Sequence, residues 1–336
     1  MATWGKASAG LFLVMAIAAL AYGGAQWDGV KQYGLSPLIL AILIGAVVGN
    51  AVPRLGQGNF RYGLSLAQRH FLRSGVALYG FNLSFQQIVQ VGATGILIDL
   101  SMVASTLLAG WYIGHRLLRM DGETVLLASA GSAICGAAAV VATAPMLRVD
   151  ARLVADKSAV AVASVVVFGS LAMFVYPLIY AWMGDGYFDF GIYVGSTVHE
   201  VAQVVAIGSA LGEELVRHAV IAKMIRVMLL VPFLLIVGWF VTGRNKTGQR
   251  APVAIPWFAV CFVAIAGVNS LSLLPESIVV LLRLSGALLL TGAMAALGID
   301  TNLARMRQAG VKPLLLGAGL FLHLVLVGGF VNWLAA

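Results

Sequence analysis

Long apolar blocks recur along the whole chain of 336 residues and constrain its fold more than any other feature. Most of them have the length that an α-helix needs to cross about 30 Å of hydrocarbon. With 61% apolar and only 10% charged residues, the chain has too little polar surface to cover a soluble core of this size. The sequence therefore predicts an all-α membrane protein, with residues 1–336 forming a single transmembrane domain. The eleven blocks are 8–24, 35–53, 66–86, 91–114, 121–146, 156–183, 187–210, 215–241, 256–272, 283–300 and 311–334.

The net charge of +8 is better explained by membrane topology than by nucleic acid. Lys and Arg lie in short loops between the apolar blocks, and no basic stripe with interleaved aromatic residues is present. We therefore expect the lipid bilayer and a small-molecule anion as partners, expect no nucleic acid, and leave a homodimer open. Near the N-terminus, Lys6 precedes an apolar run at 9–22, which fits a cleaved signal peptide or a retained helix. We favour an extra N-terminal helix at 1–24, because no clean cleavage site follows.

Two of the apolar blocks carry small and polar residues at their centres. One contains Gly131-Ser132-Ala133-Ile134-Cys135-Gly136, and the other contains Gly195-Ser196-Thr197-Val198-His199-Glu200. Such residues weaken a continuous helix. The sequence therefore predicts that both blocks are broken or re-entrant.

The two unusual blocks also match each other, with Gly131-Ser132 opposite Gly195-Ser196. A second set of matches has a larger offset and places Pro37 and Asn50 opposite Pro256 and Asn269. Together they predict an inverted repeat, with a first copy at 35–183 and a second copy at 187–334 whose parts are in permuted order.

The distribution of basic residues favours nine full spans plus the two broken segments. If both unusual blocks are re-entrant and the N-terminus is cytoplasmic, 16 of the 21 Lys and Arg residues lie inside and 5 outside. If both blocks crossed fully, Arg148, Arg152 and Lys157 would move outside, and the acidic loop with Asp185 and Asp189 would move inside. The re-entrant arrangement also gives the matched segments the opposite directions that an inverted repeat requires.

A substrate site is expected where the two breaks meet. Broken helices expose backbone N–H groups and the positive ends of half-helix dipoles, which suit an anion. The alternative is plain helix packing by small residues. For the two basic residues in the set, snorkelling to the membrane interface is a further alternative. The predicted substrate-binding residues are Gly131, Ser132, Ala133, Gly195, Ser196, Thr197, Gln203, Lys223 and Arg226.

His199 and Glu200 form an ionisable pair inside an apolar block, which is costly and usually functional. We expect them to bind a coupling proton or sodium ion. The alternative is a static ion pair between Glu200 and Lys223 or Arg226. No second His or Cys has metal-ligand spacing here, so we predict no metal and no cofactor.

Several other polar residues are weaker candidates. Asp99 lies inside a span and either serves function or hydrogen bonds between helices. Asn82 and Asp300 occupy matched positions, and Lys157 holds the place after the first break that Lys223 holds after the second. His323 is expected to be a packed polar residue and Cys135 a small core residue, and neither Cys135 nor Cys261 implies a disulfide.

No catalytic motif is present, so we predict that the protein is not an enzyme. There is no Walker motif, no HExxH and no nucleophile elbow. A passive anion channel and a non-transporting sensor or scaffold remain as alternatives to a transporter.

Several stretches resemble the YeiH-type family of bacterial inner-membrane proteins, described as uncharacterised proteins or as candidate sulfate exporters. They are residues 71–81, 131–139, 195–205, 223–228 and 294–298, and the resemblance covers nearly the whole chain. It implies a secondary carrier in the bacterial inner membrane, with a fold akin to bile-acid/sodium symporters and sodium/proton antiporters. Residues 135–145 look like the first broken helix of the bile-acid symporters, and 200–203 like the acidic second one. We therefore expect an ion-coupled secondary transporter of sulfate, a sulfonate or a small carboxylate.

Overall fold

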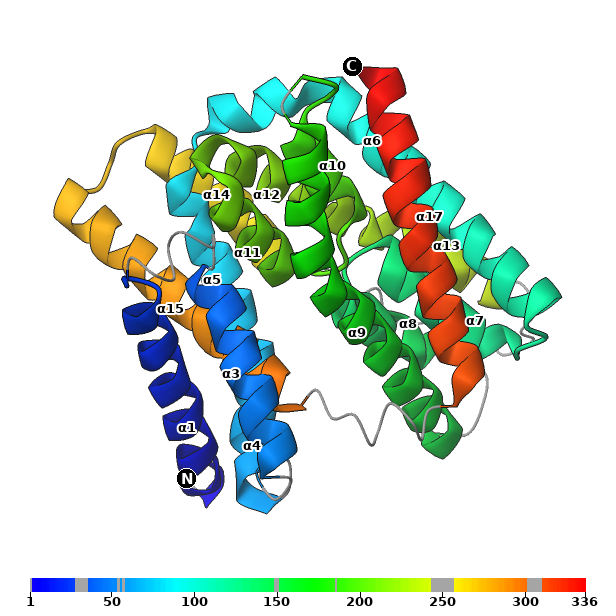
Figure 1. The fold of residues 1–336 in the computed structure, drawn as a ribbon, viewed down its shortest axis with the longest axis horizontal. Coiled ribbons are helices and arrows are strands. Elements are labelled where there is room, and N and C mark those ends of the chain that lie inside the picture. The colour runs from blue at the N-terminus through cyan, green and yellow to red at the C-terminus, as the bar shows by residue number, and fades with distance from the viewer. Residues whose placement is uncertain are drawn as a thin grey trace. The chain divides into compact units, whose positions relative to one another are not determined.

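The computed structural model describes residues 2–27, 36–52, 55, 58–147, 151–184, 186–242, 257–300 and 310–336, and every regular element in these ranges is helical (Figure 1). Arg148 and Asp185, which entered the topology argument, lie outside the described residues. The α-helices are α1 (Ala2–Gly24), α3 (Pro37–Ala51), α4 (Gly58–Leu66), α5 (Leu72–Tyr79), α6 (Phe85–Trp111), α7 (Gly122–Ala133), α8 (Ala137–Thr143), α9 (Ala151–Met183), α10 (Phe190–Thr197), α11 (Val201–Leu211), α12 (Glu213–Met228), α13 (Leu230–Thr242), α14 (Trp257–Ser270), α15 (Glu276–Asp300) and α17 (Val311–Ala335). Short π-helices at Ala67–Phe71 and Tyr112–Leu117 and 3₁₀-helices at Gly80–Asn82 and Ala144–Met146 extend some of them.

Six of the described helical stretches are long and apolar enough to cross a membrane. They are Ala7–Gly24, Gly92–Leu117, Asp156–Met183, Glu213–Trp239, Glu276–Asp300 and Val311–Ala335. The other three predicted spans, at 35–53, 66–86 and 256–272, contain shorter helices, so the number of nine spans stays a prediction.

Helix α17 illustrates why this is a membrane fold. One face is fully buried at Leu316, Leu320 and Leu324. The opposite face is just as apolar, yet Leu326 is 62% exposed and Phe330 is 56% exposed. A helix that is apolar on both its buried and its exposed face fits a lipid environment rather than water.

The chain folds into two compact units, each assembled from separate stretches of sequence. Unit 1 comprises Met1–Gln90, Val205–Glu213 and Trp257–Ala304, and unit 2 comprises Val91–Val204, Glu214–Pro256 and Arg305–Ala336. Each unit takes residues from both predicted repeats, 35–183 and 187–334, so this division leaves the repeat itself a prediction.

Unit 1 is held together by close contact between helix backbones at small residues. Helix α3 lies against α15, and α1 lies against α4 (Figure 1). A Cβ atom added at Gly49 of α3 would lie 2.2 Å from the carbonyl oxygen of Ile299 in α15. One added at Gly63 of α4 would lie 2.5 Å from the carbonyl oxygen of Ala7. Glycine is therefore required where these helices meet.

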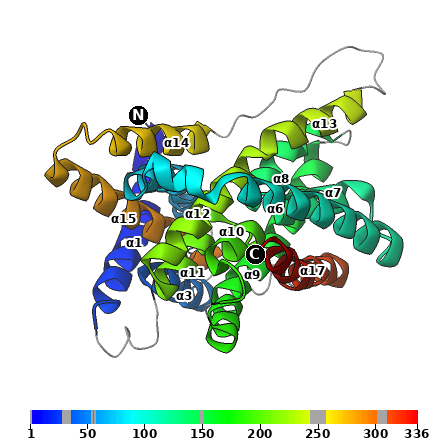
Figure 2. The same ribbon diagram turned by 90° about the horizontal axis from the view of Figure 1, so that it is seen from above.

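Unit 2 contains α7, α8, α9, α10, α12, α13 and α17, together with most of α6. Helix α17 packs against α7, α9 and α10, and Figure 2 shows α17 beside α9. The apolar core between them includes Leu127 of α7, Val140 of α8, Ala161 of α9 and Leu320 of α17. Helices α7, α8 and α10 thus belong to unit 2, whereas α11, which follows the second break, has only its first residues, Val201–Val204, in that unit.

Candidate functional site

The first predicted break is present and falls between α7 and α8. Helix α7 ends at Ala133, and Ile134 leaves helical geometry with φ −118° and ψ −81°. Gly136 then adopts φ +71° and ψ −137°, a left-handed conformation that favours glycine, and α8 begins at Ala137. The amide of Gly136 donates to the carbonyl of Gly131 at 2.9 Å and closes the end of α7. The block is therefore interrupted as the sequence predicts, but the break follows Gly131–Ala133, which form the end of α7, instead of falling on them.

The second break is also present, between α10 and α11. Val198 is extended, with φ −73° and ψ 147°, and α11 begins at Val201. His199 and Glu200 thus lie in the connecting turn and are 1% and 6% exposed. The hydroxyls of Ser196 and Thr197 both donate to the carbonyl of Tyr193, within the last turn of α10. These two hydroxyls therefore bond to their own helix end.

A pair of glycines positions α12 against the second break. A Cβ added at Gly195 would lie 2.3 Å from the carbonyl oxygen of Ala219, and one at Gly191 would lie 2.6 Å from that of Leu215. Gly191 and Gly195 are four residues apart and form a GxxxG pair, so the backbones of α10 and α12 touch. This contact brings the later part of α12, with Lys223 and Arg226, to the break.

Lys223 and Arg226 are fully buried, and both donate to backbone carbonyls at the two breaks. The ammonium of Lys223 donates to Ile134 O at 2.8 Å and to Val198 O at 2.6 Å. The guanidinium of Arg226 donates to Ser132 O at 2.6 Å, Ala133 O at 2.5 Å and Val198 O at 3.2 Å. Since the last carbonyls of a helix carry partial negative charge and lack intrahelical partners, these cations stabilise the ends of α7 and α10.

Glu200 supplies the opposite charge to the start of α8. Its Oε1 accepts the amide of Ala137 at 3.2 Å, so a carboxylate from the second break caps the helix after the first break. A Cβ added at Gly136 would lie 2.3 Å from Cγ of Glu200. Among the described ion pairs, none joins Glu200 to Lys223 or Arg226, so the alternative of a static pair with either cation finds no support.

Several buried polar atoms of unit 2 have no hydrogen-bond partner among the described residues. They are both ring nitrogens of His199, Nε2 of Gln203 and both carboxylate oxygens of Asp99. Oε1 of Gln203 accepts the Glu200 amide at 3.1 Å, and the side chain packs on Gly169 of α9. Buried polar groups are usually satisfied, and exceptions in a native fold point to a ligand, a water molecule or an ion.

The structure distributes the weaker candidates unevenly. Asp99 lies in unit 2 with the breaks, whereas Asn82 and Asp300 lie in unit 1. The amide of Asn82 donates to Tyr79 O at 3.2 Å, within its own turn. Lys157 pairs with Asp121 and Glu123 at the start of α7, so its partners are carboxylates rather than helix ends at the break.

Asn332 is a site residue that the sequence did not indicate. It is 3% exposed on α17, and its Nδ2 donates to Ser196 Oγ at 3.3 Å. Tyr176 of α9 is also buried and donates to Thr197 Oγ1 at 2.8 Å. A lone Asn near the end of an apolar span is a sequence signal for Asn332. Tyr176 has no such signal, because it resembles an ordinary aromatic core residue.

Two acidic residues outside the spanning segments cap the helices that lead into the breaks. Asp121 caps α7, accepting the Thr124 amide at 3.0 Å and pairing with Lys157. Partial burial raises the pKa of Asp121, but the hydrogen bonds from Lys157 and Thr124 outweigh it and lower the pKa to about 2. Asp189 caps α10 and pairs with His218. Its pKa is raised by burial, but the bonds from His218 and the Ile192 amide outweigh this effect and leave it below the usual range.

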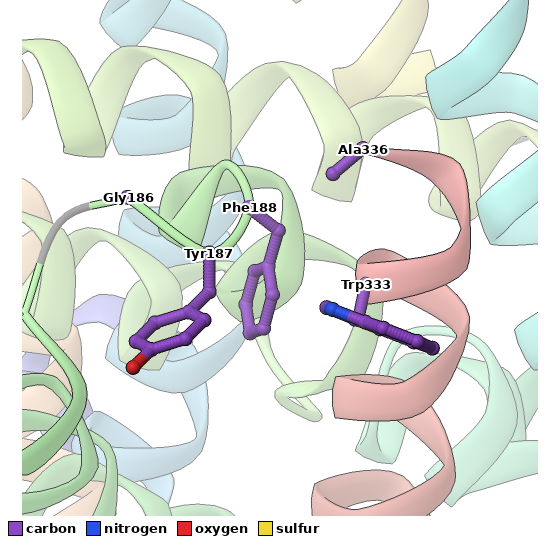
Figure 3. A pocket seen from close by; sticks show the side chains of 5 residues that line it. All are labelled: Gly186, Tyr187, Phe188, Trp333 and Ala336. Atoms are coloured by element: carbon purple, nitrogen blue, oxygen red, sulfur yellow. The ribbon is translucent and has the colours of Figure 1, made fainter.

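An open pocket of about 510 Å³ lies away from the breaks, at the loop before α10 and the end of α17. Figure 3 shows its lining, in which Tyr187 and Phe188 come from the loop before α10 and Trp333 comes from α17. Tyr187 and Trp333 are 61% and 56% exposed. Exposed aromatic rings at the ends of spans are typical of the membrane–water interface, so we assign this pocket no part in the site.

Cys135 is buried and Cys261 is exposed, and both are free thiols. His323 is partly buried and lies 3.2 Å from Ser105 Oγ. Among the described residues, no three His, Cys, Asp or Glu side chains are grouped so that they could hold a metal ion.

The protein is a helical membrane protein with a polar centre inside its fold. Its two helix breaks are joined by hydrogen bonds from buried charged side chains. Comparison with known proteins shows the family to which it belongs. The family described as Conserved hypothetical protein 698 matches residues 9–317, and the chain belongs to that family.

Curated relatives cover nearly the whole chain. It is 47% identical over 334 residues to a UPF0324 membrane protein of Yersinia pestis, covering 96% of this chain and 91% of the relative. It is 44% identical over 329 residues to the UPF0324 inner membrane protein YeiH of Escherichia coli strain K12, covering 95% and 93%. The resemblance to the YeiH-type family that the sequence motifs indicated is thus confirmed.

Proposed function

We propose that this protein is a secondary transporter that carries a small anion across the bacterial inner membrane and couples its movement to protons or sodium ions. Sulfate, a sulfonate and a small carboxylate are the substrate classes. One observation carries the proposal: two helix breaks meet around buried Glu200, Lys223 and Arg226. Broken helices mark the sites of many secondary transporters, and ionisable residues within spans are usually functional.

In this proposal His199 and Gln203 hold the anion. They are four residues apart, and three of their nitrogen atoms have no partner among the described residues. Oxygens of a small anion accept hydrogen bonds from the amide of Gln203 and from the one ring N–H that a neutral His199 carries. Ser196 and Thr197 shape the end of α10 beside them, because their hydroxyls already donate to Tyr193 O.

Lys223 and Arg226 act in two ways. Their hydrogen bonds to the carbonyls of both breaks hold the two helix ends together. Their formal charges also outweigh that of Glu200 alone, so the centre offers an anion a positive potential. Because every one of these residues lies in unit 2, the site is carried by that unit as it moves during alternating access.

Flux measurements in proteoliposomes test the proposal. Labelled sulfate and a panel of sulfonates and small carboxylates are offered with an imposed proton gradient, a sodium gradient or neither. The wild type is compared with Glu200→Gln, which removes the charge but keeps an oxygen acceptor. The matched control is Glu276→Gln, whose carboxylate is 77% exposed at the start of α15.

We expect uphill uptake of at least one anion by the wild type and by Glu276→Gln, with coupling weakened in Glu200→Gln. Absence of uptake for every anion tested would contradict the anion proposal. Uptake that is fast, never uphill and unaffected by either gradient would indicate a passive channel. A partner interaction altered by Glu200→Gln without any flux would indicate a sensor or scaffold.

A further inference from the structure

Asp99 is a buried acid that the proposed anion site does not use. It lies on α6, on a face with Met102, Val103 and Thr106, all of which are buried. The other face of α6 is apolar and exposed, as Leu97 at 62% shows. Asp99 itself has no exposed surface, so it points into unit 2 rather than toward lipid.

Asp99 differs from Glu200 in having no hydrogen-bond donor. Neither of its carboxylate oxygens has a partner among the described residues, whereas Glu200 accepts the Ala137 amide. The alternative role that the sequence left open for Asp99, a hydrogen bond between helices, is therefore not observed there. An ionised carboxylate without donors is costly to bury, and uptake of a proton removes that charge.

The face of α6 that carries Asp99 reaches the second break. A Cβ added at Gly328 of α17 would lie 2.3 Å from Thr197 Cγ2 and 3.4 Å from Met102 Cε. Met102 is one turn from Asp99, so the acid lies close to the end of α10. Arg226 and Lys223 are the cations that act on the Asp99 carboxylate.

Other groups on the neighbouring elements are farther along their helices or already paired. Helix α6 packs against α7, α10 and α17. The titratable or charged side chains of these elements are Asp121 and Glu123 at or in α7, Asp189 and Tyr193 at or in α10, and Lys312 and His323 on α17. Asp121 and Glu123 pair with Lys157, Asp189 pairs with His218, Tyr193 OH donates to Val325 O, and His323 lies against Ser105.

The formal charges of this centre make anion binding depend on Asp99. With Glu200 and Asp99 both ionised, the two carboxylates cancel Lys223 and Arg226. With Asp99 protonated, one positive charge remains for an anion to neutralise. A proton needs one oxygen atom, whereas hard metal cations need several oxygen ligands at once, and the nearby cations repel sodium.

We infer that Asp99 binds a proton together with the transported anion, which makes the protein a proton–anion symporter. This inference rests on the proposed transport function and specifies its coupling ion. The Asp99 carboxylate takes up one proton from the side on which the anion binds and releases it where the anion leaves.

Asp99→Asn tests the inference, because asparagine has the shape of the protonated acid and cannot titrate. With labelled sulfate as the first probe, we expect the wild type to accumulate sulfate when the outside is acidic. We expect Asp99→Asn to retain sulfate–sulfate exchange and to lose accumulation driven by the proton gradient. Sulfate affinity of the wild type should rise about tenfold per pH unit as pH falls through the titration of Asp99, and that of Asp99→Asn should stay level.

The matched control is Thr106→Val, on the same face of α6 and equally buried. The Thr106 hydroxyl has no hydrogen-bond partner in the part of the chain that the structure describes, and it does not titrate. It should keep proton-driven accumulation. A second measurement needs only the wild type, so it tests the inference even if Asp99→Asn does not fold. Sulfate added to weakly buffered purified protein should cause uptake of about one proton per bound anion.

Proton-driven accumulation by Asp99→Asn, accumulation driven by sodium instead of protons, or sulfate binding without proton uptake would each overturn the inference and leave anion transport standing. If the wild type exchanges neither sulfate nor any sulfonate or carboxylate of the panel, the proposed function fails, and the inference fails with it.

Discussion

The carboxylate of Glu200 accepts the amide of Ala137 across 63 positions of sequence, so an acid from the second helix break caps the helix that follows the first. Lys223 and Arg226 cap the opposite ends, at α7 and α10. The contact between the two helix breaks is therefore held by charged side chains at helix termini. Its stability should depend on Glu200, Lys223 and Arg226.

Glu200→Ala and Glu200→Gln should differ in stability. Glutamine keeps an oxygen that can accept the Ala137 amide, whereas alanine leaves a buried N–H without a partner. We expect alanine to cost about 1–3 kcal/mol more than glutamine. Thermal unfolding of the purified variants in detergent, followed by tryptophan fluorescence, measures this. Equal midpoints would mean that the Glu200–Ala137 bond contributes nothing.

Gly136→Ala should destabilise the first break for two reasons. Its φ of +71° disfavours a side chain, and the new Cβ would lie 2.3 Å from Glu200 Cγ. Backbone strain of this kind costs about 1–3 kcal/mol. Gly184→Ala is the control, because Gly184 has φ +69° but open space around it. A larger loss of melting temperature for Gly136→Ala isolates the contact with Glu200, and equal losses would assign the whole effect to backbone strain.

Arg226→Met should be among the most damaging single changes in unit 2. It removes three hydrogen bonds from the guanidinium to buried carbonyls. A hydrogen bond from a charged donor contributes about 1.5–3 kcal/mol to stability. Arg226→Lys keeps the charge but lacks the planar guanidinium, so its stability should lie between that of the wild type and that of Arg226→Met. Yield of monodisperse protein on size-exclusion chromatography ranks the three, with Arg217→Met, near the start of the same helix, as the control. Wild-type behaviour of Arg226→Met would show that water replaces the guanidinium.

The cap of α7 should weaken only in acid. Because the folded-state pKa of Asp121 is lowered to about 2, its contribution to stability is full above the unfolded-state pKa of about 4 and is lost as pH falls toward 2. The side chain is 48% exposed, so we expect Asp121→Ala to cost only about 1 kcal/mol at neutral pH. Melting temperatures of wild type and Asp121→Ala between these pH limits should converge in acid, and a constant difference would contradict this assignment.

The sequence was informative where one residue type has one common structural use. Glycine and serine in apolar blocks predicted a break in each block, at Gly131–Ala133 and Gly195–Thr197, because small residues weaken a helix. Both breaks are present, but they begin three residues later, at Ile134 and Val198. Burial of His199 and Glu200 followed from their place in an apolar block.

Partnership between distant residues was beyond the sequence. Nothing local indicates that Arg226 donates to Ser132 O, or that Glu200 meets Ala137, because these contacts depend on how two breaks cross. The GxxxG pair of Gly191 and Gly195 is the one local sequence signal for the α10–α12 contact that these residues offer. Lys157 matched Lys223 by position, yet it pairs with Asp121 and Glu123, since its helix begins beside the start of α7.

The balance of two buried bases and two buried acids in unit 2 has an electrical consequence. Moving one uncompensated charge through a membrane voltage of 100 mV changes the free energy by about 2.3 kcal/mol. When Asp99 and Glu200 are both ionised, the net formal charge of these four side chains is zero. The membrane voltage then exerts little net force on unit 2 without bound anion. When one proton and one monovalent anion are bound, the net charge is again zero. Current recorded during turnover should therefore be small for monovalent cargo and appear only with divalent cargo such as sulfate.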